Sequence, residues 1–199
     1  MGKLAFSIVA LSFLIFLAVI FSGGELFFGS LRVAPEEILG NALPEDFQVE
    51  QSISSEEGNI LVGIDRSHEL RVHVVKSAKE PLEADSTAAL LRQAKVYRVS
   101  GGERPGFLTR YLAANVDPRR AEIKHSISIR FQDGEVDDLL LLTAQKQEWF
   151  AVTYLAEQGI LLVATHPDKE VTKDAALGTM KALGFQVSSV ENTAHSSTE

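Results

Sequence analysis

The first 28 residues constrain this chain more than any other feature, because an apolar run from Leu4 to Phe21 follows Lys3, diluted only by Ser7 and Ser12. At about 1.5 Å per helical residue, these 18 positions span roughly 27 Å, close to the ~30 Å hydrocarbon core of a bilayer. The run therefore predicts a transmembrane signal-anchor over residues 1–28. The residues expected to form the anchor are Leu4, Phe6, Ile8, Leu11, Phe13, Leu14, Phe16, Leu17, Ile20 and Phe21.

A cleaved signal peptide is the alternative interpretation of the same segment. The apolar region of a signal peptide is usually ~7–15 residues long, which is shorter than this run. Ser22 and Gly24 nevertheless stand where a signal peptidase could cut before Glu25. The charge bias, with Lys3 before the run and mainly acids after it, predicts a cytoplasmic N-terminus. The sequence thus predicts a single-pass protein of the cell membrane with an extracytoplasmic body, periplasmic in a bacterium.

The remainder of the chain is long enough for one domain of ordinary size. Residues 29–45 predict a short helix and a linker, with Pro35 at the helix start. Residues 46–187 predict a single extracytoplasmic α+β domain, and residues 188–199 a disordered tail. The chain has no cysteine, which excludes a disulfide framework, a thiolate metal site and a cysteine nucleophile.

Alternation of apolar and polar residues predicts a mainly antiparallel sheet. The clearest stripe runs from Ile123 to Phe131 and places His125 on the apolar face. Asp133-Gly134 and Glu157-Gln158-Gly159 predict turns between strands. The segments expected as strands are 47–53, 60–64, 70–74, 123–131, 139–143, 149–154 and 160–165.

Helices are expected after Asp85 or Ser86, and between Pro167 and a stop at Gly184. With the short helix at Pro35, this predicts an α+β domain whose sheet is packed by two or three helices. The strand, helix and Gly-Phe ending over residues 159–187 are similar to the last strand and helix of Mog1/PsbP-like domains. The resemblance implies an architecture and no function.

Charge is distributed unevenly along a chain of net charge −8. Residues 92–130 hold nine Lys or Arg and three acids, a net of +6, whereas residues 31–91 and 131–199 are each at −7. Such a block can form a positive face for anionic headgroups, an acidic partner or a phosphate-bearing ligand, or it can consist of solvated charges neutralised by neighbours. The overall acidity argues against nucleic acid. The candidate partner contacts are Phe27, Phe28, Arg104, Arg110, Arg119 and Arg120.

No catalytic motif, metal signature or phosphate loop is recognisable, so no catalytic residue, metal ligand or cofactor is predicted. The five histidines lack ligand spacing, and the acids near Asp137 and Asp138 lack the pattern of a calcium loop. The sequence therefore favours a non-catalytic, membrane-anchored accessory or assembly protein that binds the bilayer and other membrane-protein subunits. A ligand-binding domain or an enzyme with an unrecognised site, around His166, Arg110 and Tyr111, is the alternative. Convergence of His125, His166 and the Asp137–Asp138 acids on one cleft would favour that alternative.

Overall fold

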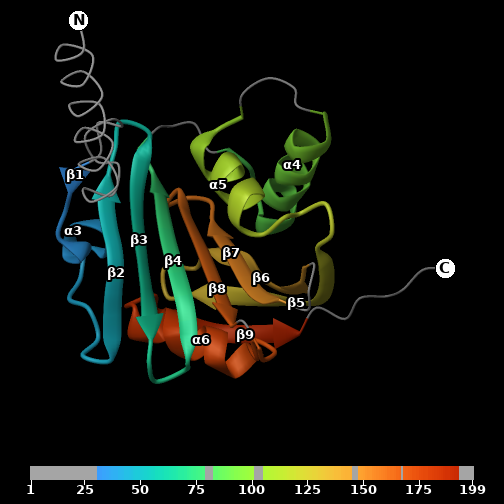
Figure 1. The fold of residues 1–199 in the computed structure, drawn as a ribbon. Helices are drawn as coiled ribbons and strands as arrows, with labels where there is room; N and C mark the ends of the chain where they lie inside the picture. The colour runs from blue at the N-terminus through green and yellow to red at the C-terminus, as the bar shows by residue number, and fades with distance from the viewer. Residues whose placement is uncertain (1–30, 79–82, 101–104, 145–147, 167, 193–199) are drawn as a thin grey trace, which may run out of the picture.

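The computed structural model describes residues 31–78, 83–100, 105–144, 148–166 and 168–192. These residues form one nine-stranded antiparallel sheet in the order β1-β2-β3-β4-β8-β7-β6-β5-β9, together with four helices (Figure 1). The strands are β1 (Leu31–Arg32), β2 (Phe47–Ser54), β3 (Gly58–Asp65), β4 (Leu70–Ser77), β5 (Glu122–Phe131), β6 (Val136–Thr143), β7 (Trp149–Leu155), β8 (Ile160–His166) and β9 (Val187–Asn192). The helices are α3 (Pro35–Leu39), α4 (Thr87–Ser100), α5 (Phe107–Asn115) and α6 (Lys173–Ala182).

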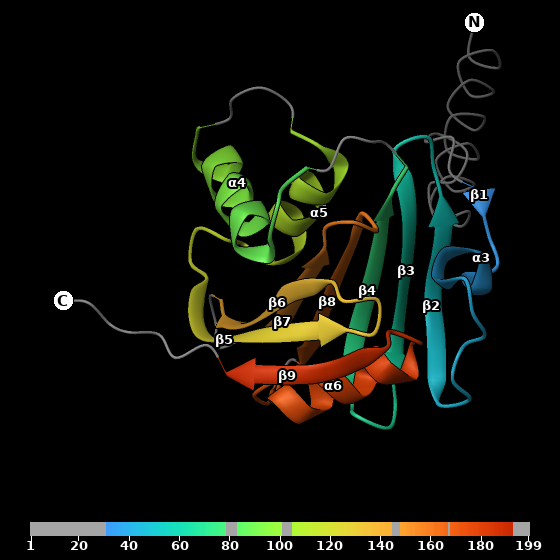
Figure 2. The same ribbon diagram turned by 180° about the vertical axis from the view of Figure 1, so that it is seen from behind.

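Helices cover both faces of the sheet. On one face α4 and α5 pack over a core that includes Leu90, Leu112 and Tyr154. On the other face α6, joined by Ile38 of α3, packs over a core that includes Leu61 and Leu141. Figure 2 shows the sheet from behind, strongly twisted, with β5, β6 and β9 running across the direction of β2 to β4. The central strands are buried on both faces, which explains why β7 and β8 are apolar almost throughout.

The expected fold class needs two corrections. Four helices, rather than two or three, pack on the sheet in the described part of the chain. Among the described residues no helix is long and apolar enough to cross a membrane. The longest, α4, has 14 residues, whereas a bilayer span takes about 20. The predicted anchor over residues 1–28 lies outside the described residues. We therefore withdraw the assignment to a cell membrane with an extracytoplasmic body.

Two further predictions differ from the structure. Residues 187–192 form β9, which pairs with β5, although residues 188–199 were expected to be a disordered tail. Val187 and Val190 pack against the α6-side core. This tertiary contact orders the segment, although its polar composition predicted disorder. His125 alternates with Ile127 and Ile129 and pairs with Leu141 on the α6 side of the sheet, as expected, but it is exposed there rather than buried.

Candidate functional site

The predicted partner contacts fall into three groups. Phe27, Phe28 and Arg104 lie outside the described residues. Arg110 is used inside the fold, where its guanidinium donates to the Pro105 carbonyl at 2.8 Å and to the Glu57 carboxylate at 2.5 Å. Arg119 and Arg120 are exposed in the turn after α5, where Arg119 also donates to Asp117 at 2.9 Å. Of the three that the structure describes, Arg119 and Arg120 have exposed side chains, and their contact with a partner stays a prediction.

A more extensive cationic surface lies on α4, beside this turn. The helix contains no acid, and Arg92, Lys95 and Arg98 are exposed and form no ion pair with any residue the structure describes. On the same helix, the side chain of Val96 is 62% exposed and that of Val99 is 71% exposed. At helical spacing, residues 92, 95, 96 and 99 share one face of the helix. We name these side chains, with Arg98, Arg119 and Arg120, the α4 basic surface.

The cationic side chains of the turn after α5 and of α4 act on the same acid, Asp117. A hydrogen bond from Arg119 holds the pKa of Asp117 below its ordinary value against the small opposing effect of burial, and the charges of Arg98 and Arg120 add to this. Arg98 of α4 therefore lies close enough to Asp117 to act on its carboxylate. One acid among these cations leaves the surface positive.

A groove of about 510 Å³ lies beside this face of α4 and shares Arg92 and Val96 with it. Its lining combines apolar side chains with cationic and amide groups, namely Ala89, Arg92, Gln93, Val96, Tyr97, Ser100 and Pro105. The local sequence explains why the face stays open. Ser86 caps the helix, its hydroxyl accepting the Ala89 N–H at 3.2 Å, and Leu90, Leu91 and Ala94 are buried on the opposite side. The first half of α4 is thereby fixed, while the exposed half projects away from the sheet (Figure 1).

The side chains that could have marked a catalytic cleft do not converge. His166 ends β8, where its Nδ1 accepts the N–H groups of Asp168 and Lys169, both at 3.0 Å. Asp137 lies at the opposite end of the strands from His166. Thr143, at the other end of β6 from Asp137, pairs with Trp149 of β7, and Trp149 pairs with His166. His125 is exposed on β5. In the described part of the chain, no three His, Asp or Glu side chains are placed to hold a metal ion.

Sequence reasoning did not anticipate a buried acid–histidine pair that fastens α6. Asp65, only 3% exposed at the end of β3, accepts hydrogen bonds from Thr179 at 2.5 Å and pairs with His68 Nδ1 at 2.7 Å. Burial acts to raise the pKa of Asp65, but the hydrogen bonds from Thr179 and His68 outweigh it, so the pKa is lowered. The His68 ring lies against Gly178 of α6, where a Cβ would clash with it. The signal available in the sequence was Asp65 itself, an acid at the end of an apolar strand.

Tyr111 makes an equivalent connection for α5. Its hydroxyl lies 2.8 Å from His73 Nδ1 on β4, and the two rings meet edge to face. Burial lowers the pKa of His73 to about 4 and raises the pKa of Tyr111 to about 12. At neutral pH the imidazole is therefore neutral and the phenol protonated, so the Tyr111 hydroxyl donates to Nδ1. Both groups stay in one protonation state across the physiological range, as expected of a structural contact.

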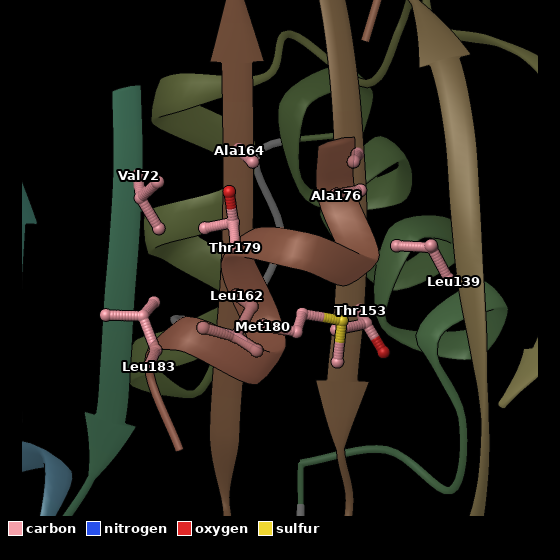
Figure 3. A pocket seen from close by; sticks show the side chains of 10 residues that line it. Val72, Leu139, Thr153, Leu162, Ala164, Ala176, Thr179, Met180 and Leu183 are labelled. Atoms are coloured by element: carbon pink, nitrogen blue, oxygen red, sulfur yellow. The ribbon is translucent and has the colours of Figure 1, made fainter. Parts of the chain in front are cut away.

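Between α6 and the sheet lies a small apolar cavity (Figure 3). Its volume is about 20 Å³, room for about one water molecule. Met180 and Leu183 of α6 approach Leu162 and Thr153 of the sheet across it (Figure 3). The Thr153 hydroxyl is buried there and has no hydrogen-bond partner among the described residues. The cavity is a packing defect, too small for a ligand.

Comparison with known proteins gives no match: no family model, curated protein or solved structure corresponds to this chain. The resemblance of residues 159–187 to Mog1/PsbP-like domains accordingly stays an architectural analogy. The function must be argued from the surface of the domain itself, and the α4 basic surface is its most distinctive feature.

Proposed function

We propose that this domain is a non-catalytic binding module that docks an acidic segment of a partner protein, bearing apolar side chains, on the α4 basic surface. The single observation that carries the proposal is the acid-free α4, which exposes Val96 and Val99 next to Lys95 and Arg98. This retains the accessory role expected from the sequence, without its membrane assignment.

The apolar part of the surface supplies affinity. Fully burying a Val side chain is worth about 1.5–3 kcal/mol, and Val96 and Val99 lie within one turn of each other. Their large exposed fractions leave most of that free energy available to a partner. Exposed apolar side chains beside charged ones are also the composition of protein interfaces, which combine an apolar core with a polar rim.

The cations select the partner. The surface holds five of them, Arg92, Lys95, Arg98, Arg119 and Arg120, on a chain whose net charge is −8. Asp117 is the acid on which Arg98, Arg119 and Arg120 act. Rim charges of one sign mainly raise the association rate and reject partners of the same sign. An acidic segment with apolar side chains at helical spacing satisfies both requirements. A second copy of this acidic chain would be repelled except where its own segments meet this surface.

A defined peptide pair tests the proposal. The probe is a fluorescent helical peptide with Leu at helical spacing and Glu elsewhere, and its control replaces every Glu with Gln. We expect the acidic peptide to bind the full-length chain at least about tenfold more tightly than its control, with binding weakened by salt. Equal binding of both peptides, or binding indifferent to salt, contradicts the charge argument.

Matched variants locate the site on the chain. Lys95→Glu on α4 and Lys181→Glu on α6 change the net charge equally on opposite faces of the sheet. Val96→Ser and Val136→Ser likewise pair two exposed valines. We expect Lys95→Glu and Val96→Ser each to weaken acidic-peptide binding by about fivefold or more. The α6 and β6 controls should bind like the unmodified chain, and equal loss in a control would refute the assignment to α4.

A further inference from the structure

A second depression, independent of the α4 basic surface, lies on the α6 face of the sheet. It has a volume of about 480 Å³ and forms where four segments distant in sequence converge. These are the ends of α3 and α6, the β5–β6 turn and the β7–β8 turn. Its volume falls within the range typical of small-molecule sites, about 300–1,000 Å³. Neither the sequence nor the proposed protein-binding role accounts for it.

The wall of this cleft is held in place by the two helix ends. Asn41, after α3, donates from Nδ2 to the Leu183 carbonyl at 3.1 Å. Gly184 follows with φ +91°, and a Cβ there would clash with the Asn41 amide. Glycine at this position therefore lets the ends of α3 and α6 approach closely. The cleft is a built feature of the fold rather than a gap between independent loops.

The charged residue that lines the cleft is acidic. Asp133 lines the cleft, and none of the lining residues is Lys, Arg or His. Beside it, Glu135 accepts the Glu157 N–H at 3.1 Å and a Gln158 Nε2 hydrogen bond at 3.3 Å, and Gln158 is itself a lining residue. None of these acids forms an ion pair with a residue that the structure describes. Among the described residues, no cationic side chain therefore pairs with the acids at this end of the cleft.

A buried carboxyl group at the same end strengthens this argument. Asp137, two positions after Glu135, alternates with Leu139 and Leu141 on β6, so its side chain lies on the α6 face of the sheet, although it does not itself line the cleft. It is only 6% exposed, and its Oδ2 has no hydrogen-bond partner within the described residues. A buried carboxyl oxygen without a partner is costly in a folded protein, typically about 1–3 kcal/mol. The negative charge of Glu135 also acts on Asp137, so a positive charge bound near Glu135 would reduce the repulsion between the two acids.

The rest of the cleft is apolar and aromatic. Phe131 and Phe185 contribute aromatic rings, and Leu39, Ile160 and Leu183 contribute aliphatic surface. Aromatic rings attract cations through their faces, and carboxylates hydrogen-bond ammonium groups. A neutral ligand would gain nothing from the charge of the acids, and an anion would be repelled. The combination matches an alkylammonium ion with a short apolar body.

We propose that this cleft binds a small organic cation, an amine whose ammonium group lies at the Asp133 and Glu135 end and whose carbon chain lies against Phe131 and Phe185. This binding function goes beyond docking on α4, and each can fail without the other.

Three probes of equal carbon-chain length test the ligand class: putrescine, 1,4-butanediol and succinate. Titration calorimetry on the full-length chain should show putrescine binding at least about tenfold more tightly than the diol, and no binding of succinate. Comparable binding of the diol, or failure of putrescine to bind, overturns the proposal.

Two adjacent acids provide the matched variants. Asp133→Asn keeps the Oδ1 that accepts the Glu135 N–H at 3.1 Å but removes the charge from the cleft. Asp138→Asn removes the same charge from β6, where alternation directs the side chain to the α4 face. Gln186→Lys, at the exposed lip, introduces repulsion without touching Asp133. We expect Asp133→Asn and Gln186→Lys to weaken putrescine binding about fivefold or more, and Asp138→Asn to leave it unchanged. Equal loss in all three would show general attraction to an acidic surface and overturn the proposal.

Discussion

Replacing Asp137 with Asn should stabilise the protein at neutral and alkaline pH but not in acid. Burial, followed by the negative charge of Glu135, raises the pKa of Asp137 to about 7. The same carboxyl group in the unfolded chain titrates near 3.9. Between these values the folded state holds a proton that the unfolded state has released. Stability contributed by this group is therefore greatest below about pH 4, falls as pH rises from about 4 to 7, and is constant above.

The magnitude follows from the difference in pKa. About three pKa units at 1.36 kcal/mol per unit set an upper limit of roughly 4 kcal/mol. Glu135 shares this titration, and the nearby turn is solvated, so we expect about 2 kcal/mol. The amide of Asn cannot ionise, so Asp137→Asn should be about 2 kcal/mol more stable than the unmodified chain at pH 8. At pH 4 the two should differ by less than about 0.5 kcal/mol.

Urea unfolding measured from pH 4 to pH 8 on both proteins gives the difference in free energy of unfolding at each pH. Titrating groups outside this pair act equally on both chains, so that difference reports Asp137 together with the coupled Glu135. Asp138→Asn, one residue along β6, is the control; its charge contributes less to the raised pKa of Asp137 than burial and Glu135 do, so its pH-dependent gain should be much smaller. A difference that is the same at pH 4 and pH 8 would refute the reasoning, because it would show that Asp137 ionises normally in the folded protein.

Three other predictions concern packing around α6. Asp65→Asn should cost about 2 kcal/mol at pH 7 by urea unfolding, because a carboxylate holding several hydrogen bonds is lost. Since the folded pKa of Asp65 is lowered, this penalty should shrink as pH falls below about 4, and an undiminished penalty would contradict the assignment. Thr153→Val should raise stability by about 1 kcal/mol, or roughly 3 °C in Tm, because the buried hydroxyl lacks a partner; a loss would indicate an unseen one. Gly178→Ala should destabilise through its clash with His68 yet stabilise by about 1 kcal/mol in a His68→Ala background, and the same sign in both backgrounds would exclude this contact.

Local signals in the sequence predicted the elements whose structure is determined locally. Alternation identified β5, and Gly134 and Gly159, at φ +95° and +62°, occupy the turns expected for them. Ser86 caps α4, and Gly184 lies just past the end of α6, as predicted. In each case the determining residue lies within a few positions of the element that it ends.

Elements stabilised from a distance escaped prediction. Helix α5 has no side-chain cap of its own, and the carboxylate of Glu83 accepts the N–H groups of Leu108 and Thr109, both at 2.8 Å. A cap supplied 25 residues away leaves no local pattern. Strand β9 likewise exists through its pairing with β5. Helix α6 differs, because it begins at Lys173, later than expected from Pro167, for a local reason: the side chain of Thr172 accepts the Ala175 N–H.

The candidate site was only partly predictable for a related reason. The basic block over residues 92–130 was visible in the sequence, but charge counting could not separate Arg110, paired with Glu57, from Arg98, which stays exposed. Nor could it show that Val96 and Val99 project from α4 rather than into the core. Both distinctions depend on which face of α4 the sheet covers, and that is a tertiary property.

Cross-linking in the cells that produce the protein tests the α4 proposal most directly. A photoreactive residue at Val99 is compared with one at Leu31, since the two side chains are 71% and 72% exposed. We expect Val99, and not Leu31, to yield one discrete adduct whose cross-linked segment is acidic and bears apolar residues, and we expect Lys95→Glu to abolish it. Identical products from both positions, an adduct insensitive to Lys95→Glu, or no adduct at Val99 would contradict the account.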